Sequence, residues 1–280
     1  MRLATVVSAL VKDRGMSDRS VVVAAAVNNE QILATTLALS PDLVSVLVEF
    51  MPVRGAASAS TAYNSVLART TADLVIFVHQ DVYLPYGWIS QILAEADRLD
   101  KVAPDWAVMG VYGITRQGSH VGRLWSGDQQ VELVGSGGSS GEIESLDEVV
   151  LILRTDAGLR FDPDLPHFHL YGTDIVQMAA AAGRSAHVVA APVVHNTVPV
   201  ASLAGGFTAG YRFMQHKWAA RLPIVTSMTT ITRNGLPLMR ALARHSWYAF
   251  KAKLSGNSPP RVTDVVALAR TIGYEPLINA

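Results

Sequence analysis

Three sets of ionisable residues in this chain lie next to apolar runs, where their side chains could do chemistry. His79-Gln80-Asp81 directly follows the five apolar residues Leu74–Val78. Asp174 precedes a run of helical composition, and His195 follows two valines. Imidazole and carboxylate groups bind divalent cations or move protons. The residue types therefore point to metal binding or acid–base catalysis.

Each of these positions also has a purely structural explanation. Asp81 could begin a turn. Asp174 falls in the first turn of a predicted helix, where the helix dipole favours a carboxylate and Thr173 could be the N-cap. A histidine at the end of a strand, such as His195, is often only a hydrogen-bonding residue. Two further histidines have the same two explanations, His167 and His169.

The elements around these residues alternate between strands and helices. Short apolar runs rich in β-branched residues are typical of strands buried on both faces. Three are predicted, at Val21–Val27, Leu43–Val48 and Leu74–Val78. Helices are predicted at Gln31–Ala38, Ser58–Thr70 and Trp88–Leu99. This order predicts an α/β fold in which helices flank a mixed, largely parallel sheet with right-handed crossovers.

Polar side chains follow all three predicted strands. They are Asn28 and Glu30 after the first, Glu49 after the second, and His79 and Asp81 after the third. Ligands of open α/β sheets bind beyond the carboxyl ends of the strands. Loops are polar in general, which is the simpler explanation, but the recurrence at three strand ends favours a binding crevice.

The rest of the chain is predicted to add strands and then helices. The further strands are Trp106–Tyr112, Val121–Trp125, Val131–Val134, Val149–Leu153 and Ala186–Val194, with a helix at Ile175–Ala182. The glycine-rich stretch 135–141 precedes another strand rather than a helix, so it is interpreted as a flexible loop over a site, not as a phosphate-binding loop. Later helices are predicted at Phe207–Arg221, Leu236–Leu254 and Val262–Ile272. We therefore divide the chain into a domain at 1–200 and a helical extension at 201–280, which is a subdomain or a dimerisation element.

Composition excludes several classes of protein. The 280 residues carry 23 basic and 23 acidic side chains, so the clustered basic excess of a nucleic-acid binder is missing. No cysteine is present, which excludes disulfides and thiolate metal ligands. No apolar run reaches about 18 residues, and Leu3–Val11 lacks a convincing cleavage site, so neither a membrane span nor a signal peptide is predicted. We predict a cytoplasmic protein, with peripheral contact to a membrane left open by the apolar composition.

As a set, these residues resemble glycosyltransferases of the GT-A fold, family 2-like. The resemblance rests on five segments in the same order: Val27–Glu30, Ala62–Asn64, Phe77–Val82, Phe161–Asp174 and Pro192–His195. The third, F-V-H-Q-D-V, is similar to a bacterial subgroup in which this motif replaces the usual Asp-x-Asp. The resemblance covers about residues 20–200, and it implies a GT-A type sheet there. It does not cover the helical tail.

The resemblance also implies roles for single residues. Asp81 and His195 would hold Mn²⁺ or Mg²⁺ against the donor's diphosphate, and Asp174 would be the base that deprotonates the acceptor hydroxyl. Contacts with the nucleotide-sugar or the acceptor are implied for Asn28, Glu30, Glu49, Arg54, Asn64, His79, Gln80, Asp147 and Glu148. Further cations that could assist the leaving group are Lys217 and Arg221. His79 replaces the first Asp of the usual motif, so it could be a metal ligand or a ribose contact.

These inferences predict a metal-dependent glycosyltransferase that moves a hexosyl or deoxyhexosyl group from a nucleotide-diphosphate donor to an acceptor hydroxyl. One base and one metal, rather than two flanking carboxylates, favour single displacement with inversion. A non-catalytic nucleotide-sugar-binding module is an alternative, favoured by His79. A nucleotidyltransferase is a weaker one, because Val21–Glu30 contains no glycine. The acceptor could be a glycan, a lipid-linked glycan, a protein or a small molecule, and the C-terminal helices could form a homo-oligomer.

Overall fold

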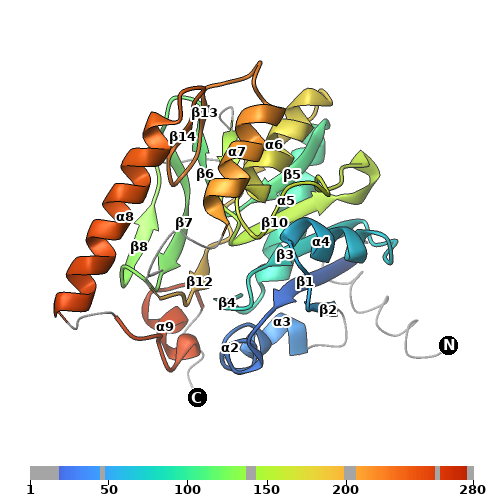
Figure 1. Ribbon diagram of the computed structural model, residues 1–280. Helices are drawn as coiled ribbons and strands as arrows, with labels where there is room; N and C mark the ends of the chain where they lie inside the picture. Colours follow the sequence, from blue (N-terminus) through green and yellow to red (C-terminus); the bar gives the residue numbers. More distant parts are fainter. Residues whose placement is uncertain (1–18, 45–47, 137–142, 199–205, 256–258, 276–280) are drawn as a thin grey trace, which may run out of the picture.

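The fold is built around a six-stranded mixed sheet. A computed structural model describes residues 19–44, 48–136, 143–198, 206–255 and 259–275. The strand order is β11-β5-β10-β3-β1-β2. The bounds are β1 Val21–Val27, β2 Glu49–Arg54, β3 Leu74–Val78, β5 Trp106–Gly110, β10 Val150–Arg154 and β11 Ser185–Val188. Only β10 runs against its neighbours. The predicted α/β fold class, with a largely parallel sheet flanked by helices, is confirmed (Figure 1).

Helices cover both faces of this sheet. The bounds are α2 Glu30–Thr35, α4 Ala59–Leu67, α5 Trp88–Val102 and α6 Tyr171–Ala181. Side chains alternate along a strand, so Val23 and Ala25 of β1 pack with α2 and α5, whereas Val22 and Ala24 pack with α4 and α6. All five residues of β3 are buried. That double coverage explains why its sequence is an unbroken apolar run.

A second sheet continues from the carboxyl end of β3. Its order is β4-β12-β7-β6-β9, and β8 pairs with β7. The bounds are β4 Val82–Tyr83, β6 Tyr112–Thr115, β7 His120–Ser126, β8 Val131–Val134, β9 Ile143–Leu146 and β12 Val193–His195. In the pairing of β12 with β4, His195 lies opposite Val82. This register brings His195 beside the chain that leaves β3.

The C-terminal part packs on the rest at two places. The elements are α7 Phe207–Lys217, β13 Ile224–Val225, β14 Thr230–Ile231, α8 Leu236–Ser255 and α9 Val265–Thr271. The helices α7 and α8 and the β13–β14 hairpin form an apolar cluster with Leu170. α9 packs on Tyr83, Trp125 and Val194. Among the described residues, no helix combines the length and apolar character needed to cross a bilayer. The division near residue 200 stays a prediction.

Several predicted elements differ from the structure. The strand at Leu43–Val48 is wrong: α3 occupies Pro41–Val44, and β2 begins at Glu49 and contains Pro52. Proline is tolerated there because β2 is an edge strand that pairs only with β1. The single strand predicted at Ala186–Val194 is two strands in the structure, β11 and β12, and they belong to different sheets. The predicted elements at residues 1–18, and most of the glycine-rich stretch, lie outside the described residues.

Candidate active site

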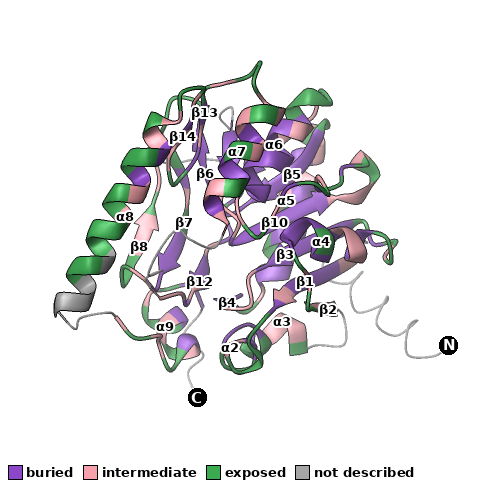
Figure 2. Ribbon diagram, viewed as in Figure 1, coloured by how far each residue is buried: buried purple, intermediate pink, exposed green. Residues whose placement is uncertain are grey.

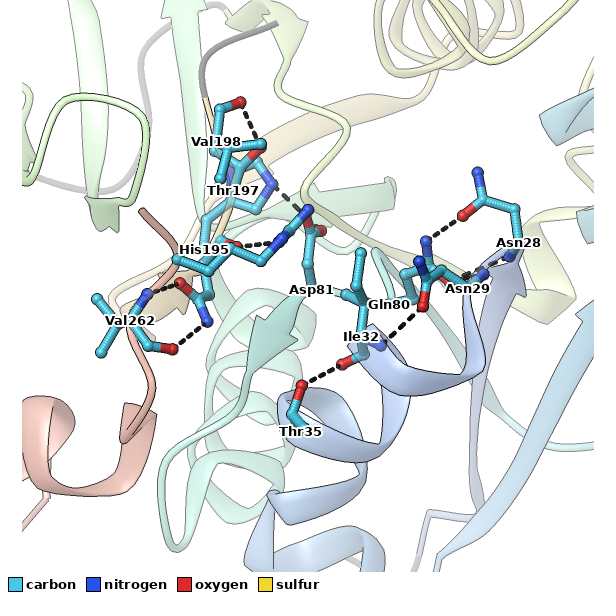
Figure 3. A network of polar contacts seen from close by, with 12 residues as sticks. Asn28, Asn29, Ile32, Thr35, Gln80, Asp81, His195, Thr197, Val198 and Val262 are labelled. Atoms are coloured by element: carbon cyan, nitrogen blue, oxygen red, sulfur yellow. Dashed lines mark hydrogen bonds and ion pairs between the residues drawn. The ribbon is translucent and has the colours of Figure 1, made fainter. Parts of the chain in front are cut away.

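A cluster of two histidines and one carboxylate lies where the two sheets meet. Ligand atoms of His79, Asp81 and His195 all lie within 4.8 Å of one another. Asp81 Oδ1 is 3.4 Å from His195 Nε2, and the two side chains point toward each other (Figure 3). The backbone N–H of Asn196 donates to the carbonyl of Asp81 at 2.8 Å. The ends of β3 and β12 therefore hold the cluster together.

The cluster is electrostatically coupled. Burial acts to raise the pKa of Asp81, but the neighbouring His195, His79 and Arg261 hold that pKa far below its ordinary value. Burial disfavours protonation of His195, yet the Asp81 carboxylate raises the pKa of His195 above its ordinary value. Burial and His195 together lower the pKa of His79. Asp81 is therefore ionised at neutral pH, and His79 is the more readily neutral of the two imidazoles.

Arg261 from the C-terminal part contacts the second oxygen of Asp81. Its Nη1 lies 3.2 Å from Asp81 Oδ2 and also donates to the carbonyl of Asn196. The side chain of Asn196 holds Val262, the residue after Arg261. It accepts from the N–H of Val262 at 2.8 Å and donates to the carbonyl of Val262 at 2.9 Å. Sequence reasoning missed Arg261, because no local pattern indicates which carboxylate it reaches.

These residues fit a divalent cation. Two imidazoles and a carboxylate form a nitrogen–oxygen donor set that suits divalent transition ions. The Tyr171 hydroxyl lies 2.9 Å from His79 Nε2 and donates to the carbonyl of Glu148 at 3.1 Å. This contact positions the ring of His79, as outer groups commonly do for metal-binding histidines.

One cavity adjoins the cluster at the ends of β1 and β2. Its volume is about 570 Å³, and its lining includes Asn28, Glu30, Arg54, His79, Gln80 and Asp81. The side chain of Gln80 connects two strand ends, because its Oε1 accepts from the N–H groups of Asn28 and Asn29, each at 3.0 Å (Figure 3). Arg54 pairs with Glu30. The structure thus brings the predicted metal ligand Asp81 together with five residues for which the resemblance implies contact with the nucleotide-sugar or the acceptor.

A second cavity lies on the other side of His79. Its volume is about 520 Å³, and its lining includes His79, Asp147, Glu148, His169 and His195. His79 is the one lining residue that the two cavities share among those that the structure describes. Burial and the neighbouring Asp147 carboxylate raise the pKa of Glu148 to about 8. A carboxyl group with that pKa can exchange protons near neutral pH.

Comparison with known proteins identifies the family. A model of the glycosyltransferase-like family matches residues 21–204, which is more than half of the chain. The chain belongs to the glycosyltransferase-like family. A relative from Fuscovulum blasticum, described as ATP synthase subunits region ORF 6, is 28% identical over 136 residues, which span 45% of this chain and 53% of that protein. This match therefore spans about half the length of that curated relative.

Solved structures show weaker likenesses. A Pyrobaculum calidifontis mannosyltransferase in complex with GDP-Man and Mn²⁺ is 12% identical, with a TM-score of 0.42, and covers 91% of this chain and 79% of its own. The structure of GalNAc-T7 with UDP, GalNAc and Mn²⁺ is 10% identical, with a TM-score of 0.41. The match covers 94% of this chain and 59% of GalNAc-T7 as solved. Both likenesses are too weak to add to the family match.

Two residues of this glycosyltransferase-like protein lie away from the positions expected for them. Glu49 begins β2 and pairs with Val22, so it lies at the opposite end of the sheet from Asn28. The Asn64 side chain donates to the carbonyl of Phe161 at 2.8 Å and accepts from the N–H of Phe161 at 3.0 Å. Neither residue lines the two cavities described above. Their ligand contacts stay predictions.

Asp174 anchors the C-terminal part and lines neither of the two cavities described above. It is 2% exposed. Lys217 Nζ lies 2.8 Å from Oδ2, and Trp218 Nε1 donates to Oδ1 at 2.7 Å. Helix α6 begins at Tyr171 with Leu170 as its N-cap, so Thr173 is not the cap. Both carboxylate oxygens of Asp174 are engaged, and the geometry does not support the predicted role as general base.

This arrangement predicts a structural role for Asp174. The change Asp174→Asn should lower the free energy of unfolding by about 2–3 kcal/mol, because a buried charge-assisted pair is lost. Urea unfolding would measure this effect. Asp164→Asn is a matched control, because Asp164 is exposed nearby, and it should change stability by no more than about 0.5 kcal/mol. Equal midpoints for the two variants would contradict the structural role.

Proposed function

We propose that this protein transfers a sugar from a nucleotide-diphosphate donor to an acceptor hydroxyl. The observation that carries the proposal is the His79–Asp81–His195 cluster, which lies where two cavities adjoin. The cavity at Asn28 and Gln80 would hold the nucleotide end of the donor. The cavity at Glu148 would hold the acceptor. The family match supports this assignment.

The donor side requires positive charge. When the bond between the sugar and the diphosphate breaks, its electron pair passes to a phosphate oxygen, and negative charge develops there. A divalent cation bound by the cluster would neutralise that charge. Arg261 contributes a guanidinium at Asp81. We infer that this guanidinium also faces the diphosphate. Arg261 would then assist the leaving group in place of Lys217 and Arg221. Those two side chains contact Asp174 and Gln177 instead.

The acceptor side requires a base. As the acceptor oxygen bonds to the sugar carbon, its proton must pass to a nearby group. Glu148 is the carboxyl that lines this cavity with a pKa in the useful range. Asp147 lines it as well, accepting from the N–H of Val149 at 3.1 Å. One base across from one cation favours single displacement with inversion.

Donor binding provides a direct test. UDP-, GDP- and dTDP-sugars would be screened by thermal shift, with and without Mn²⁺. At least one should raise the melting temperature, and more so with Mn²⁺, because a ligand at 100 times its Kd adds about 2.7 kcal/mol to the stability of the folded state. Slow hydrolysis of that donor would support turnover. Binding without hydrolysis or transfer would favour a nucleotide-sugar-binding module, and no binding would contradict the proposal.

A further inference from the structure

Helix α8 carries an apolar stripe that the fold leaves uncovered. Its members recur at spacings of three and four residues, so they share one face of the helix. They are Leu236, Met239, Ala243, Trp247 and Phe250, and all are exposed. Met239 is 65% exposed, and Trp247 is 57% exposed. Helix α8 forms an outer edge of the molecule, and most of its surface is exposed (Figure 2).

The fold uses a different face of the same helix. Leu238 and Ala241 are buried at 7% and 3% exposure, and they pack with α7 and the β13–β14 hairpin. Leu242 packs against the same cluster. Helix α8 therefore has two apolar faces, and the intramolecular core accounts for one of them. Large aromatic side chains on the other face call for a partner outside the described part of the chain.

Basic residues border the uncovered stripe. Arg240, Arg244 and Lys251 each follow a stripe residue directly, so they lie together on one flank of it, and all three are exposed. Lys251 Nζ lies 5.4 Å from the Trp247 ring centroid. The sequence of α8 contains no Asp or Glu. An apolar stripe bordered by three basic residues and by no acidic residue of α8 matches a surface that is apolar inside and anionic outside.

We propose that α8 docks in the surface of a membrane that contains anionic lipids. A helix lying in the interface buries its apolar face among the acyl chains, while its basic residues contact the headgroups. Tryptophan and tyrosine favour this depth, and Tyr248 is 61% exposed beside Trp247. A second copy fits less well, because isologous pairing of two stripes would align two basic borders with no α8 carboxylate to offset them.

Docking would also orient the second cavity. His245 of α8 and Met228, whose carbonyl accepts from Arg244 at 3.4 Å, both line the cavity that contains Glu148. A docked α8 would therefore hold this cavity near the lipid headgroups. If the proposed transfer function is right, this placement favours a lipid-linked acceptor over a soluble one.

Vesicle binding tests the docking without any donor or acceptor. The full chain would be sedimented with phosphatidylcholine vesicles, with and without phosphatidylglycerol. We expect binding that requires phosphatidylglycerol and weakens with salt. The variant Arg240→Gln/Arg244→Gln/Lys251→Gln should bind about 100-fold more weakly, since each basic residue near an anionic surface contributes about fivefold. Trp247→Ser/Phe250→Ser should also bind at least about tenfold more weakly.

The controls separate docking from misfolding and self-association. Val102→Ser removes an equally exposed apolar side chain at the end of α5, where it is 65% exposed, and it should bind vesicles as the unaltered chain does. Circular dichroism would confirm that each variant is folded. Failure of the unaltered chain to bind phosphatidylglycerol vesicles would overturn the proposal. A dimer in solution that dissociates in Trp247→Ser/Phe250→Ser, with no vesicle binding, would overturn it in favour of a second copy.

Discussion

Replacing Asp81 with Asn is expected to reduce kcat/KM for sugar transfer by at least about 10³-fold. Asp81 contributes the carboxylate of the cluster and contacts both His195 and Arg261. Asparagine has nearly the same shape but no charge, so it cannot neutralise a cation or hold Arg261 by charge. Mn²⁺ affinity should fall as well, which titration calorimetry would measure without any substrate.

The matched control is Asp156→Asn. Asp156 pairs with Arg154, the last residue of β10. Arg154 lies opposite Leu74, the first residue of β3, so Asp156 is at the other end of the strands from Asp81. This variant should keep both Mn²⁺ binding and transfer activity. If Asp81→Asn bound Mn²⁺ as tightly as the unaltered chain, the cluster would not be the metal site. Full transfer by a folded Asp81→Asn variant would exclude a catalytic role for the carboxylate.

Replacing Glu148 with Gln is expected to lower kcat by about 10²–10⁴-fold while donor binding is retained. Burial and Asp147 raise the pKa of Glu148 to about 8, and a base acts in its ionised form. The kcat of the unaltered chain should therefore rise about tenfold per pH unit below that pKa and level off above it. The Gln variant should lose this rise. Steady-state kinetics across pH would measure both profiles.

The stability of the same variant gives an independent readout. The folded-state pKa of Glu148 is raised above the ordinary value of 4.5. Folding therefore favours the neutral carboxyl group. The free energy of unfolding that this preference adds is lost as pH rises through about 8. Glu148→Gln should melt at a higher temperature than the unaltered chain at pH values above this pKa, and the difference should shrink on acidification. A variant that melts lower at every pH would indicate a structural role instead.

Asp174→Asn distinguishes the two candidate bases. Its carboxylate is bound by Lys217 and Trp218, so a folded Asn variant should keep transfer within about tenfold, as expected when no transition-state contact is removed. If Asp174→Asn instead lost transfer as severely as Glu148→Gln and kept its stability, the base would be Asp174. In that case Lys217 and Trp218 would have to move away when the acceptor binds.

Local sequence patterns were sufficient for much of the fold. The strand Leu74–Val78 was predicted with its observed bounds, because a short apolar run can satisfy burial on both faces only in the middle of a covered sheet. The apolar face of α5 was predicted from its spacing, and Ile89, Ile92 and Ala96 are buried. Asp81 and His195 stand out in the sequence because each follows an apolar run, at a point where a side chain can leave the core.

Long-range packing decided what these patterns could not. The contact between Arg261 and Asp81 joins residues 180 positions apart, and nothing near either residue encodes it. Burial beside Asp147 raises the pKa of Glu148, whereas the pairing of Asp174 with Lys217 and Trp218 occupies its oxygens. The sequence by itself indicated Asp81, Glu148 and His195 as candidates for chemistry, and it determined the strand Leu74–Val78 that leads to Asp81. Only the tertiary structure decided which carboxylates face a cavity, because that depends on partners that the folded chain brings from a distance.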